Sequence, residues 1–282
     1  MILIADSGST KTDWRTIDSN GVIAQASTSG INPYYHNQEA IIDILRDELL
    51  SQVEDSVEEI HFYGAGCSSD ENKVMVRRSL MEVFGEIRVN VDHDLTAAAR
   101  SLCGKNPGIA CILGTGANSC LYDGSKIVSN VPSLGYILGD EGSGAYLGKK
   151  LLSAYIQNRL PQIISDRFYK RFELSGTDLL NKIYKEKVGG RYLASFSKFI
   201  FQNIKDPYLY RLVYDSFLDF FDRNIVMYED YLKQKVHFTG SVAFYYSNIL
   251  RQVANDKGIT IQNIIESPIA GLALYHQQNP NH

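Results

Sequence analysis

The sequence predicts an α/β protein of two related domains, each built around a mixed β-sheet, and three observations lead to that prediction. An apolar strand that runs into a Gly/Ser/Thr corner occurs at residues 2–12 and again at 109–119, so that Gly8 aligns with Gly116. Two further strand-like segments follow each corner. The periodicity then becomes helical over about residues 145–232, inside the second copy.

The first copy continues with helices and strands in alternation. The expected elements after its three opening strands are a helix over 38–50, a strand at 59–63, a helix over about 71–84, a strand at 87–91 and a helix that begins near Leu95. This β-β-β-α-β-α-β-α order predicts a mixed sheet with helices on its faces.

The second copy opens with three strands from Gly108 and then becomes helical. Between Gly142 and about Leu232, apolar positions recur every three or four residues and aromatic residues are dense, which indicates an interhelical core. The elements expected after this region are a strand at 236–238, a helix over about 243–254, a strand at 259–261 and a last helix that starts at Pro268.

These patterns divide the chain into two domains. We expect the first domain over residues 1–105 and the second over 106–267, with the helical insertion at about 145–232 in the second. The final helix, within 268–282, is expected to pack back on the first domain. No Pro-rich or Ser-rich linker separates the two copies, so a tight hinge is expected between them.

Composition excludes several classes of function. The 282 residues include 44% hydrophobic and 21% charged residues, with a net charge of −4, which argues against nucleic acid or an anionic membrane as the main partner. Apolar stretches are short, and Met1 leads directly into a strand without a basic leader, so a cytoplasmic protein is expected. The four cysteines form no CxxC pair, so a zinc site is not expected and buried thiols are.

The first corner has the chemistry of a phosphate site. Asp6 ends the strand, and Gly8 allows the positive φ angles of a tight turn. Backbone N–H groups, hydroxyls and an ammonium group follow, a set of donors that suits phosphate oxygens. Asp6 is expected to hold Mg²⁺ through water. The alternative is a plain β-hairpin with a polar turn. The corner is not a Walker P-loop or a dinucleotide fingerprint, because GxxxxGK(S/T) is absent and a strand follows each corner.

Three segments carry a resemblance to a known family. They are GTGAN at 114–118, GDEGS at 139–143 and a Thr-Gly-Ser turn at 239–241. Over nearly its whole length the chain resembles the N-acetylglucosamine kinases of the BadF/BadG/BcrA/BcrD ATPase family, within the sugar kinase/actin/heat-shock-chaperone ATPase superfamily. The resemblance implies two duplicated ribonuclease H-like (actin-like ATPase) domains with mixed five-stranded sheets, with ATP and Mg²⁺ as cofactors.

The resemblance also assigns roles to individual residues. Asp94 matches the catalytic base, which accepts a proton from the sugar hydroxyl. The implied ATP-binding residues are Gly8, Ser9, Thr10, Lys11, Thr12, Gly114, Thr115, Gly116, Gly240 and Ser241. The implied sugar-binding residues are Asn32, Asp94, Ala117, Asn118, Gly135 and Asp140.

Each of the carboxylate and amide assignments has a structural alternative. Asp94 could be only a helix cap, with Asp92 and His93 as rival candidates for the base. Asn32 stands before a proline, where asparagine favours a turn. Asp140 and its acidic neighbour Glu141 could be first-turn charges on the helix that follows.

The sequence departs from the family pattern in two places. Ser133-Leu134-Gly135 stands where a Gly-Trp-Gly-like segment precedes GDEGS, and Ser7 and Ser9 stand where glycines are common in the first corner. Because the segment at 133–135 would line the sugar site, its change makes the assignment of the sugar less certain than the assignment of phosphoryl transfer as the reaction.

We therefore expect an ATP-dependent amino-sugar kinase that phosphorylates N-acetylglucosamine at its 6-hydroxyl. The alternatives are a kinase for glucosamine or N-acetylmuramic acid, a sugar-binding regulator without catalysis, and an ATPase activator of an iron–sulfur reductase or dehydratase. The activator needs thiolate ligands, and no cysteine follows Cys120, which disfavours it. The expected partner is a small amino sugar. The sequence leaves a homodimer, the regulation of the protein and the contacts to the adenine open.

Overall fold

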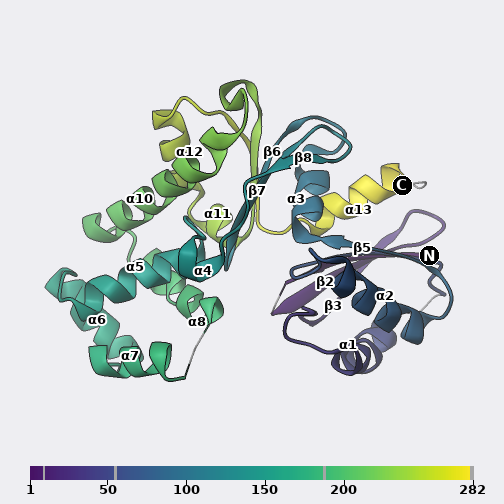
Figure 1. The fold of residues 1–282 in the computed structure, drawn as a ribbon, viewed down its shortest axis with the longest axis horizontal. Helices are drawn as coiled ribbons and strands as arrows, with labels where there is room; N and C mark the ends of the chain where they lie inside the picture. Colours follow the sequence, from purple (N-terminus) through teal and green to yellow (C-terminus); the bar gives the residue numbers. More distant parts are fainter. Residues whose placement is uncertain (9, 54–55, 187–188, 280–282) are drawn as a thin grey trace. The chain divides into compact units, whose positions relative to one another are not determined.

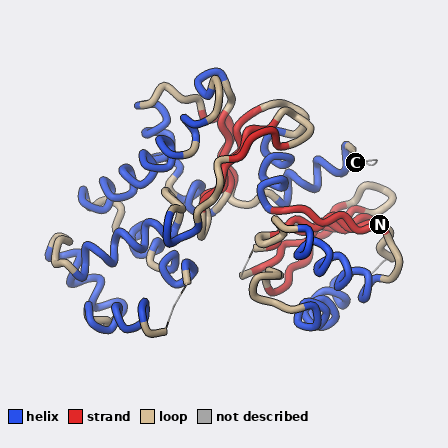
Figure 2. The backbone as a smooth tube through the Cα atoms, in the orientation of Figure 1, coloured by secondary structure: helices blue, strands red, loops and turns tan. Residues whose placement is uncertain are grey.

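The computed structural model describes residues 1–8, 10–53, 56–186 and 189–279. The chain separates into two compact units, each with a central sheet and surrounding helices (Figures 1 and 2). Unit 1 contains Met1–Asn106, Gly124–Lys126 and Ser267–His282, and unit 2 contains Pro107–Asp123 and Ile127–Glu266.

Unit 1 has a five-stranded sheet in the order β3-β2-β1-β4-β5. Its strands are β1 (Ile2–Ser7), β2 (Lys11–Ile17), β3 (Ile23–Ser29), β4 (Glu59–Gly64) and β5 (Arg88–His93). The first three strands form an antiparallel meander, and β4 and β5 are parallel to β1. The carboxyl ends of β1, β4 and β5 therefore meet at one edge of the sheet, where parallel strands usually place a site.

Helices cover both faces of this sheet. They are α1 (Gln38–Ile44), α2 (Asp70–Phe84), α3 (Asp94–Cys103) and α13 (Ile269–Gln278). The helix expected over 38–50 is irregular, because α1 continues as a π-helical turn at Leu45–Leu49 and a 3₁₀ turn at Leu50–Gln52. In Figure 1, α13 lies beside α3, and Leu272 of α13 packs with Ile4 and Ala97.

The sheet of unit 2 repeats the topology of unit 1 in the order β10-β9-β6-β7-β8. Its strands are β6 (Gly108–Leu113), β7 (Ala117–Tyr122), β8 (Ile127–Asn130), β9 (Val236–Thr239) and β10 (Ile261–Ile265). The pairs β6–β7 and β7–β8 are antiparallel, whereas β9 is parallel to both β6 and β10. The predicted fold class, two duplicated domains with mixed five-stranded sheets, is confirmed.

Unit 2 contains many helices. They are α4 (Gly135–Leu138), α5 (Gly144–Ile156), α6 (Gln162–Phe172), α7 (Gly176–Tyr184), α8 (Gly190–Ser195), α9 (Ser197–Gln202), α10 (Pro207–Arg223), α11 (Ser241–Tyr245) and α12 (Ser247–Asp256). Two boundaries differ from prediction. The helix expected over 243–254 is broken into α11 and α12 at Tyr246, and the strand expected at 259–261 begins only at Ile261.

The dense aromatic residues of unit 2 form the interhelical core that the sequence predicts. Phe168 of α6 is fully buried and contacts the rings of Phe196 and Phe199, with centroids 5.7 and 5.4 Å apart. Phe220 and Phe221 of α10 pack against other buried aromatic rings in the same cluster. Within the described ranges, the helices are too short or too polar to cross a lipid bilayer.

Candidate functional site

The first corner is the hairpin turn between β1 and β2. The N–H of Gly8 donates to the carbonyl of Lys11 at 3.0 Å. Gly8 does not adopt the left-handed backbone that glycine allows, and a Cβ there would lie 3.6 Å from the Lys11 carbonyl, an ordinary contact. Ser9, an expected ATP ligand, lies outside the described residues. Thr10 is exposed, and Lys11 Nζ pairs with Asp13 Oδ1 at 2.6 Å.

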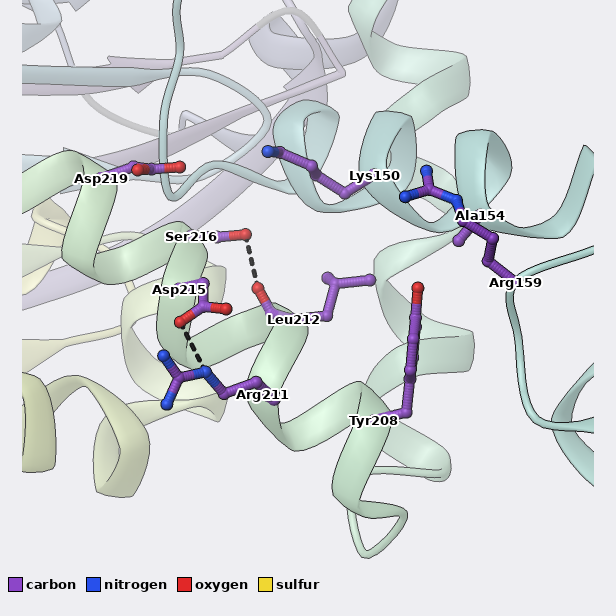
Figure 3. Close-up of a pocket in the computed structure, with 9 residues that line it drawn as sticks. All are labelled: Lys150, Ala154, Arg159, Tyr208, Arg211, Leu212, Asp215, Ser216 and Asp219. Carbon is purple, nitrogen blue, oxygen red and sulfur yellow. Dashed lines mark hydrogen bonds and ion pairs between the residues drawn. The ribbon is translucent and has the colours of Figure 1, made fainter. Parts of the chain in front are cut away.

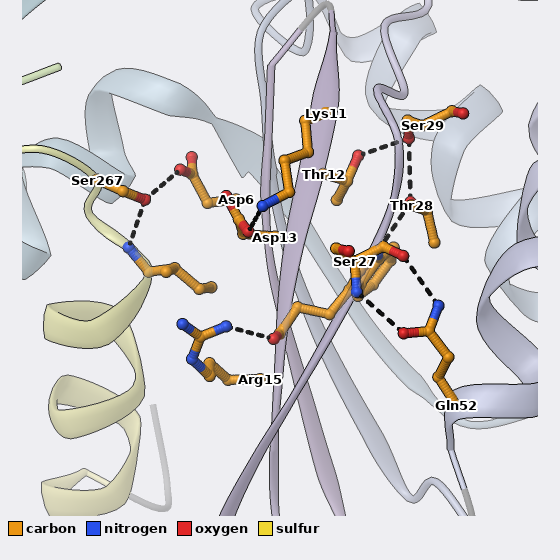
Figure 4. Close-up of polar contacts among 12 residues, drawn as sticks. Asp6, Lys11, Thr12, Asp13, Arg15, Ser27, Thr28, Ser29, Gln52 and Ser267 are labelled. Atoms are coloured by element: carbon orange, nitrogen blue, oxygen red, sulfur yellow. Dashed lines mark hydrogen bonds and ion pairs between the residues drawn. The ribbon is translucent and has the colours of Figure 1, made fainter. Parts of the chain in front are cut away.

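Two buried hydroxyl groups fasten the segment after β3 to this corner. Ser7 Oγ and Thr12 Oγ1 lie 2.6 Å apart, and the N–H of Ile31 is within 3.0 and 3.2 Å of them. Thr12 also donates to the carbonyl of Ser29 at 3.2 Å (Figure 4). The Thr12 hydroxyl is thus used inside the scaffold, whereas that of Thr10 lies at the surface. The sequence did not single out Ser7 for this role.

Asn32, the expected sugar ligand of unit 1, is 4% exposed and organises its own turn. Its Oδ1 accepts the N–H of Tyr34 at 2.9 Å, and its carbonyl accepts the N–H of His36 at 3.0 Å. Gly66 provides the space for this side chain, because a Cβ at Gly66 would lie 2.4 Å from Asn32 Oδ1. Gly66 also has a φ of +85°, which favours glycine. Its contact with Asn32 was not predicted.

The three candidates for the catalytic base have different surroundings. Asp92 accepts from Lys73 Nζ and from the N–H of His93, both at 2.9 Å. His93 is the N-cap of α3, because its Nδ1 accepts the N–H of Leu95 at 3.2 Å. Asp94 is the first residue of α3. The ion pair and the cap thus occupy Asp92 and His93, which favours Asp94 as the base.

The charge of Asp94 acts on the carboxyl group of Asp6. Burial, followed by the charges of Asp94 and Asp13, raises the pKa of Asp6 to about 7, against the opposing effect of a hydrogen bond from Ser267. Ser267 Oγ is 3.5 Å from Asp6 Oδ2 (Figure 4). Burial also raises the pKa of Asp94. Ser267 follows the last strand of the chain and was not among the predicted site residues.

The donor set of Asp6, Asp13 and Asp94 suits a hard cation. The charges of Asp94 and Asp13 raise the pKa of Asp6, and a divalent ion would offset that concentration of negative charge. In the part of the chain that the structure describes, no group of three or more His, Cys, Asp and Glu side chains forms a complete metal cage. Mg²⁺ does not need one, because it keeps several waters and binds through one or two carboxylates. The residues present therefore fit Mg²⁺.

The second corner, between β6 and β7, is braced by the start of α5. The N–H groups of Gly144 and Ala145 donate to the carbonyls of Gly114 and Thr115 at 2.8 and 3.0 Å. These bonds use N–H groups that a helix N-terminus leaves free. The Thr115 side chain is exposed at the surface of the turn. Thr10 and Thr115 are thus both exposed in their respective corners.

The turn after β9 packs directly against this corner. Gly240 has a φ of +112°, and a Cβ there would lie 2.4 Å from the carbonyl oxygen of Leu113 and 3.1 Å from the N of Gly114. Only glycine fits this approach. Ser241 begins α11 immediately afterwards and is exposed. The structure thus brings Gly240 close to Gly114.

Asp140 lies beneath the second corner in a strained backbone conformation. Its φ is +60°, which is uncommon for a residue other than glycine. Its Oδ1 accepts from the N–H of Ala117 at 3.2 Å and from Ser133 Oγ at 3.4 Å. A Cβ at Gly116 would lie 3.1 Å from Asp140 Oδ2, so Gly116 gives the carboxylate room. Burial raises the pKa of Asp140, and these hydrogen bonds oppose that rise. Strain of this kind is typical of functional residues.

Asn118 and Gly135 are the two further sugar-binding candidates of unit 2. Within the described residues, neither forms a hydrogen bond with Asp140. Asn118 Oδ1 accepts the N–H of Ser119 at 2.9 Å and Asn130 Nδ2 at 3.1 Å, which directs the Asn118 amide. Gly135 begins α4, with a φ of +69°, and its carbonyl accepts the N–H of Gly139 at 2.8 Å.

The acidic pair before α5 is not part of that helix. Ser143 is the N-cap of α5, and its Oγ accepts the N–H of Tyr146 at 3.1 Å. Asp140 and Glu141 therefore precede the first turn, and the alternative that they are its charges is wrong. Glu141 is buried and pairs with Arg223 Nη1 at 2.7 Å.

Two cavities lie apart from these corners. One, of about 230 Å³, lies between α5 and α10 in unit 2, where Lys150 and Arg159 extend from the α5 side and Arg211 pairs with Asp215 on α10 (Figure 3). The other, of about 210 Å³, lies at the β5 edge of unit 1. Neither is lined by an expected ATP-binding or sugar-binding residue.

Comparison with known proteins adds sequence and fold similarity. No family profile matches the chain. Over 163 residues the chain is 27% identical to the N-acetyl-D-glucosamine kinase of Dictyostelium discoideum, which covers 52% of this chain and 51% of that protein. The chain thus spans about half the length of this curated relative.

Two solved structures resemble the chain over nearly its full length. A Porphyromonas gingivalis protein provisionally named an N-acetylglucosamine kinase is 41% identical, with a TM-score of 0.94 and coverage of 99% of this chain and 100% of that one. A Chromobacterium violaceum protein with the same provisional name is 17% identical, with a TM-score of 0.77 and coverage of 97% and 98%. The second shows a shared fold alone.

Proposed function

The chain belongs to the family of N-acetylglucosamine kinase-like proteins, and from that membership we propose that it transfers the γ-phosphoryl group of ATP to the 6-hydroxyl of N-acetylglucosamine. The observation that carries the proposal is the electrostatic effect of Asp94, which follows β5, on Asp6, which lies near the end of β1. The two carboxylates would serve as base and cation ligand in phosphoryl transfer.

The proposed roles in unit 1 follow from the surroundings of each side chain. Asp94 accepts the proton of the sugar hydroxyl. At the same time the hydroxyl oxygen bonds to the γ-phosphorus, and the bond between the γ-phosphorus and the bridging oxygen, which leaves with ADP, breaks. The raised pKa of Asp94 brings a carboxylate closer to the neutral range, where a general base works well. Asn32 orients the sugar. Asp6 would hold Mg²⁺, which neutralises phosphate charge when bound.

The proposed roles in unit 2 concern both substrates. The backbone of 114–116 and the exposed hydroxyl of Thr115 bind phosphate oxygens, with Gly240 and Ser241 beside them. Asp140 accepts a hydroxyl of the sugar, because its carboxylate is already fixed by Ala117 and Ser133. The amide of Asn118 completes the sugar contacts.

The state of the cysteines supports a kinase over an iron–sulfur activator. All four are buried, and none forms a disulfide. Burial raises the pKa of Cys67 and of Cys103 to about 12, so both stay protonated at neutral pH. Cluster ligands must be thiolates.

The test is a coupled assay of ADP release over a panel of sugars, with Mg²⁺ present. The panel contains N-acetylglucosamine, glucosamine, N-acetylmuramic acid and glucose. We expect the highest kcat/KM with N-acetylglucosamine, because a site that bonds the acetamido group penalises sugars without it. NMR of the product then identifies the phosphorylated oxygen. Equal ADP release with and without sugar would refute kinase activity, and a preference for another sugar would refute only the substrate assignment.

A further inference from the structure

The cavity at the β5 edge of unit 1 carries an unusual set of charges. β5 is an edge strand of its sheet, and the cavity measures about 210 Å³. Its lining residues, from β4, α2, β5 and α3, are His61, Tyr63, Arg77, Asn90, Val91, Asp92 and Arg100. At roughly 30 Å³ per water molecule, it has the volume of about seven waters, which is room for a phosphate with several attached atoms.

Arg100 is the most constrained cation of this cavity. Its Nη1 donates to the hydroxyl of Tyr63 at 2.6 Å, and its guanidinium lies over the rings of Tyr63 and Tyr275, 5.7 and 5.4 Å from the centroids. Its Nε is enclosed and has no hydrogen-bond partner. Among the described residues, no carboxylate forms an ion pair with it at 4 Å or less. Asp92 acts on this guanidinium electrostatically without a direct ion pair.

Arg77 supplies a second positive charge from the other side of the edge strand. Its Nε donates to the carbonyl of Val89 at 3.2 Å, which ties the α2 side chain to β5. It forms no ion pair with any described carboxylate. Asp92, the acidic residue of the lining, is already paired with Lys73 at 2.9 Å. Among the described residues, neither Arg77 nor Arg100 thus forms an ion pair, although the charge of Asp92 acts on Arg100.

The remaining lining groups are neutral. His61 Nε2 contacts Glu59 Oε1 at 3.0 Å, and Arg88 Nε contacts the same oxygen at 3.2 Å. Burial, with the charges of Arg100 and Arg88, lowers the pKa of His61 to about 4, so the ring is uncharged at neutral pH. Asn90 is exposed on the edge strand, and its Nδ2 donates to the same Glu59 oxygen at 3.3 Å.

We propose that this cavity is a binding site for a phosphate group, either free phosphate or that of a small phosphomonoester. A phosphate dianion compensates both guanidinium charges, whereas a carboxylate compensates only one. Arginine binds phosphate oxygens through two parallel N–H donors, and both arginines face the same cavity. The site is separate from the phosphate corners, and its assignment does not depend on kinase activity.

Isothermal titration calorimetry with inorganic phosphate and with glucose 6-phosphate tests the proposal. A non-hydrolysable ATP analogue and Mg²⁺ are kept saturating, so that phosphate does not occupy the corners. The matched variants are Arg77→Ala and Arg78→Ala, because these neighbours on α2 are both exposed and only Arg77 lines the cavity. A charged hydrogen bond contributes about 1.5–3 kcal/mol, so Arg77→Ala should weaken phosphate binding roughly 10- to 100-fold. Arg78→Ala should leave it unchanged.

The two probes separate the sources of the phosphate. Equal affinities identify free phosphate as the ligand, and tighter binding of glucose 6-phosphate identifies a phosphomonoester. A second variant, Arg100→Lys, retains the positive charge but loses the two parallel N–H donors of the guanidinium. It should also weaken phosphate binding, while circular dichroism shows an intact fold. Absence of binding at millimolar phosphate, or equal affinities in Arg77→Ala and Arg78→Ala, would overturn the proposal.

Discussion

Asp94, at the start of α3, acts electrostatically on Asp6, at the end of β1. After burial, the charge of Asp94 is the largest cause of the rise in the Asp6 pKa to about 7. Two carboxylates arranged in this way disfavour each other's ionised form until a cation or a proton offsets the charge. The first two predictions follow from this relationship.

Asp6→Asn should stabilise the metal-free protein at pH 8. The pKa of Asp6 is about 7 in the fold against its ordinary 3.8, so the folded state binds the proton more tightly than the unfolded state. Wild type therefore loses stability as pH rises from about 4 to 7, and the neutral variant does not. At about 1.36 kcal/mol per pKa unit, we expect a gain of up to roughly 4 kcal/mol at pH 8 and almost none at pH 4. Urea denaturation in EDTA measures it, with Asp43→Asn on α1 as an exposed control. A gain independent of pH would contradict the assignment.

Asp94→Asn should remove turnover and leave substrate binding nearly unchanged. Asparagine keeps the shape of the side chain and cannot accept the hydroxyl proton, and loss of a general base costs about 10²–10⁴ in rate. Steady-state kcat and calorimetric Kd values for sugar and nucleotide measure the two effects. Asp92→Asn is the neighbouring control, because its carboxylate is held by Lys73. If Asp92→Asn lost more activity than Asp94→Asn, the base would be misassigned.

Substitutions of the three corner threonines should have different effects, depending on whether the hydroxyl is exposed or buried. Thr10→Val and Thr115→Val each remove an exposed hydroxyl and should raise KM for ATP about tenfold with little change in KM for the sugar. Thr12→Val instead removes a buried hydroxyl from the contacts that hold Ile31, so it should lower Tm. Kinetics and thermal denaturation of all three variants test this. Unchanged ATP kinetics in both exposed variants would make the corners structural only.

Gly66→Ala should raise KM for the sugar. The added Cβ would lie 2.4 Å from Asn32 Oδ1, so the Asn32 side chain must move. Gly85→Ala is a matched control, because Gly85 has the same φ of +85° and nothing within 4 Å of the added atom. Both variants carry the backbone strain, and only Gly66→Ala displaces Asn32. A similar KM for the sugar in the two variants would show that Asn32 does not contribute to sugar binding.

Gly240→Ala should destabilise unit 2 and raise KM for ATP. Its Cβ would lie 2.4 Å from the Leu113 carbonyl oxygen, at the start of the second corner, and backbone atoms have little freedom to yield. Gly258→Ala, with a φ of +68° and open space around it, carries the strain alone. Thermal denaturation and ATP kinetics compare the two. An equal effect of both substitutions would mean that the approach to the corner is unimportant.

The duplicated topology was predictable because local patterns encode it. Each corner stands between an apolar strand and two further strands, and both sheets have the expected strand arrangement. Periodicity and turn residues carry that information within a few positions. Local signals failed at the expected helix over 243–254, where the chain turns at Tyr246, whose buried side chain bonds the Ser197 carbonyl at 2.7 Å.

The candidate site was predictable only in part, because several of its residues act through distant contacts. Nothing beside Ser7 in the sequence shows that it will bind Ile31, and Gly66 is separated from Asn32 along the chain. Ser267 reaches Asp6 from the other end of the sequence. The cap formed by His93 was equally hidden, since histidine is not a favoured N-cap residue. Folding creates these relationships, so single-sequence patterns do not contain them.

The placement of α13 has a consequence for how the protein folds during its synthesis on the ribosome. Ile269, Leu272 and Ala273 complete the apolar cluster against Ile4 and Ala97, although more than half of the chain separates them. At about 5–20 residues per second, roughly 8 to 33 seconds pass between the synthesis of Asn106 and that of α13. Throughout that interval the part of the sheet and of α3 that α13 covers stays exposed. The first part of the protein to be made is therefore among the last to be finished, and it is the part that a chaperone would have to shield.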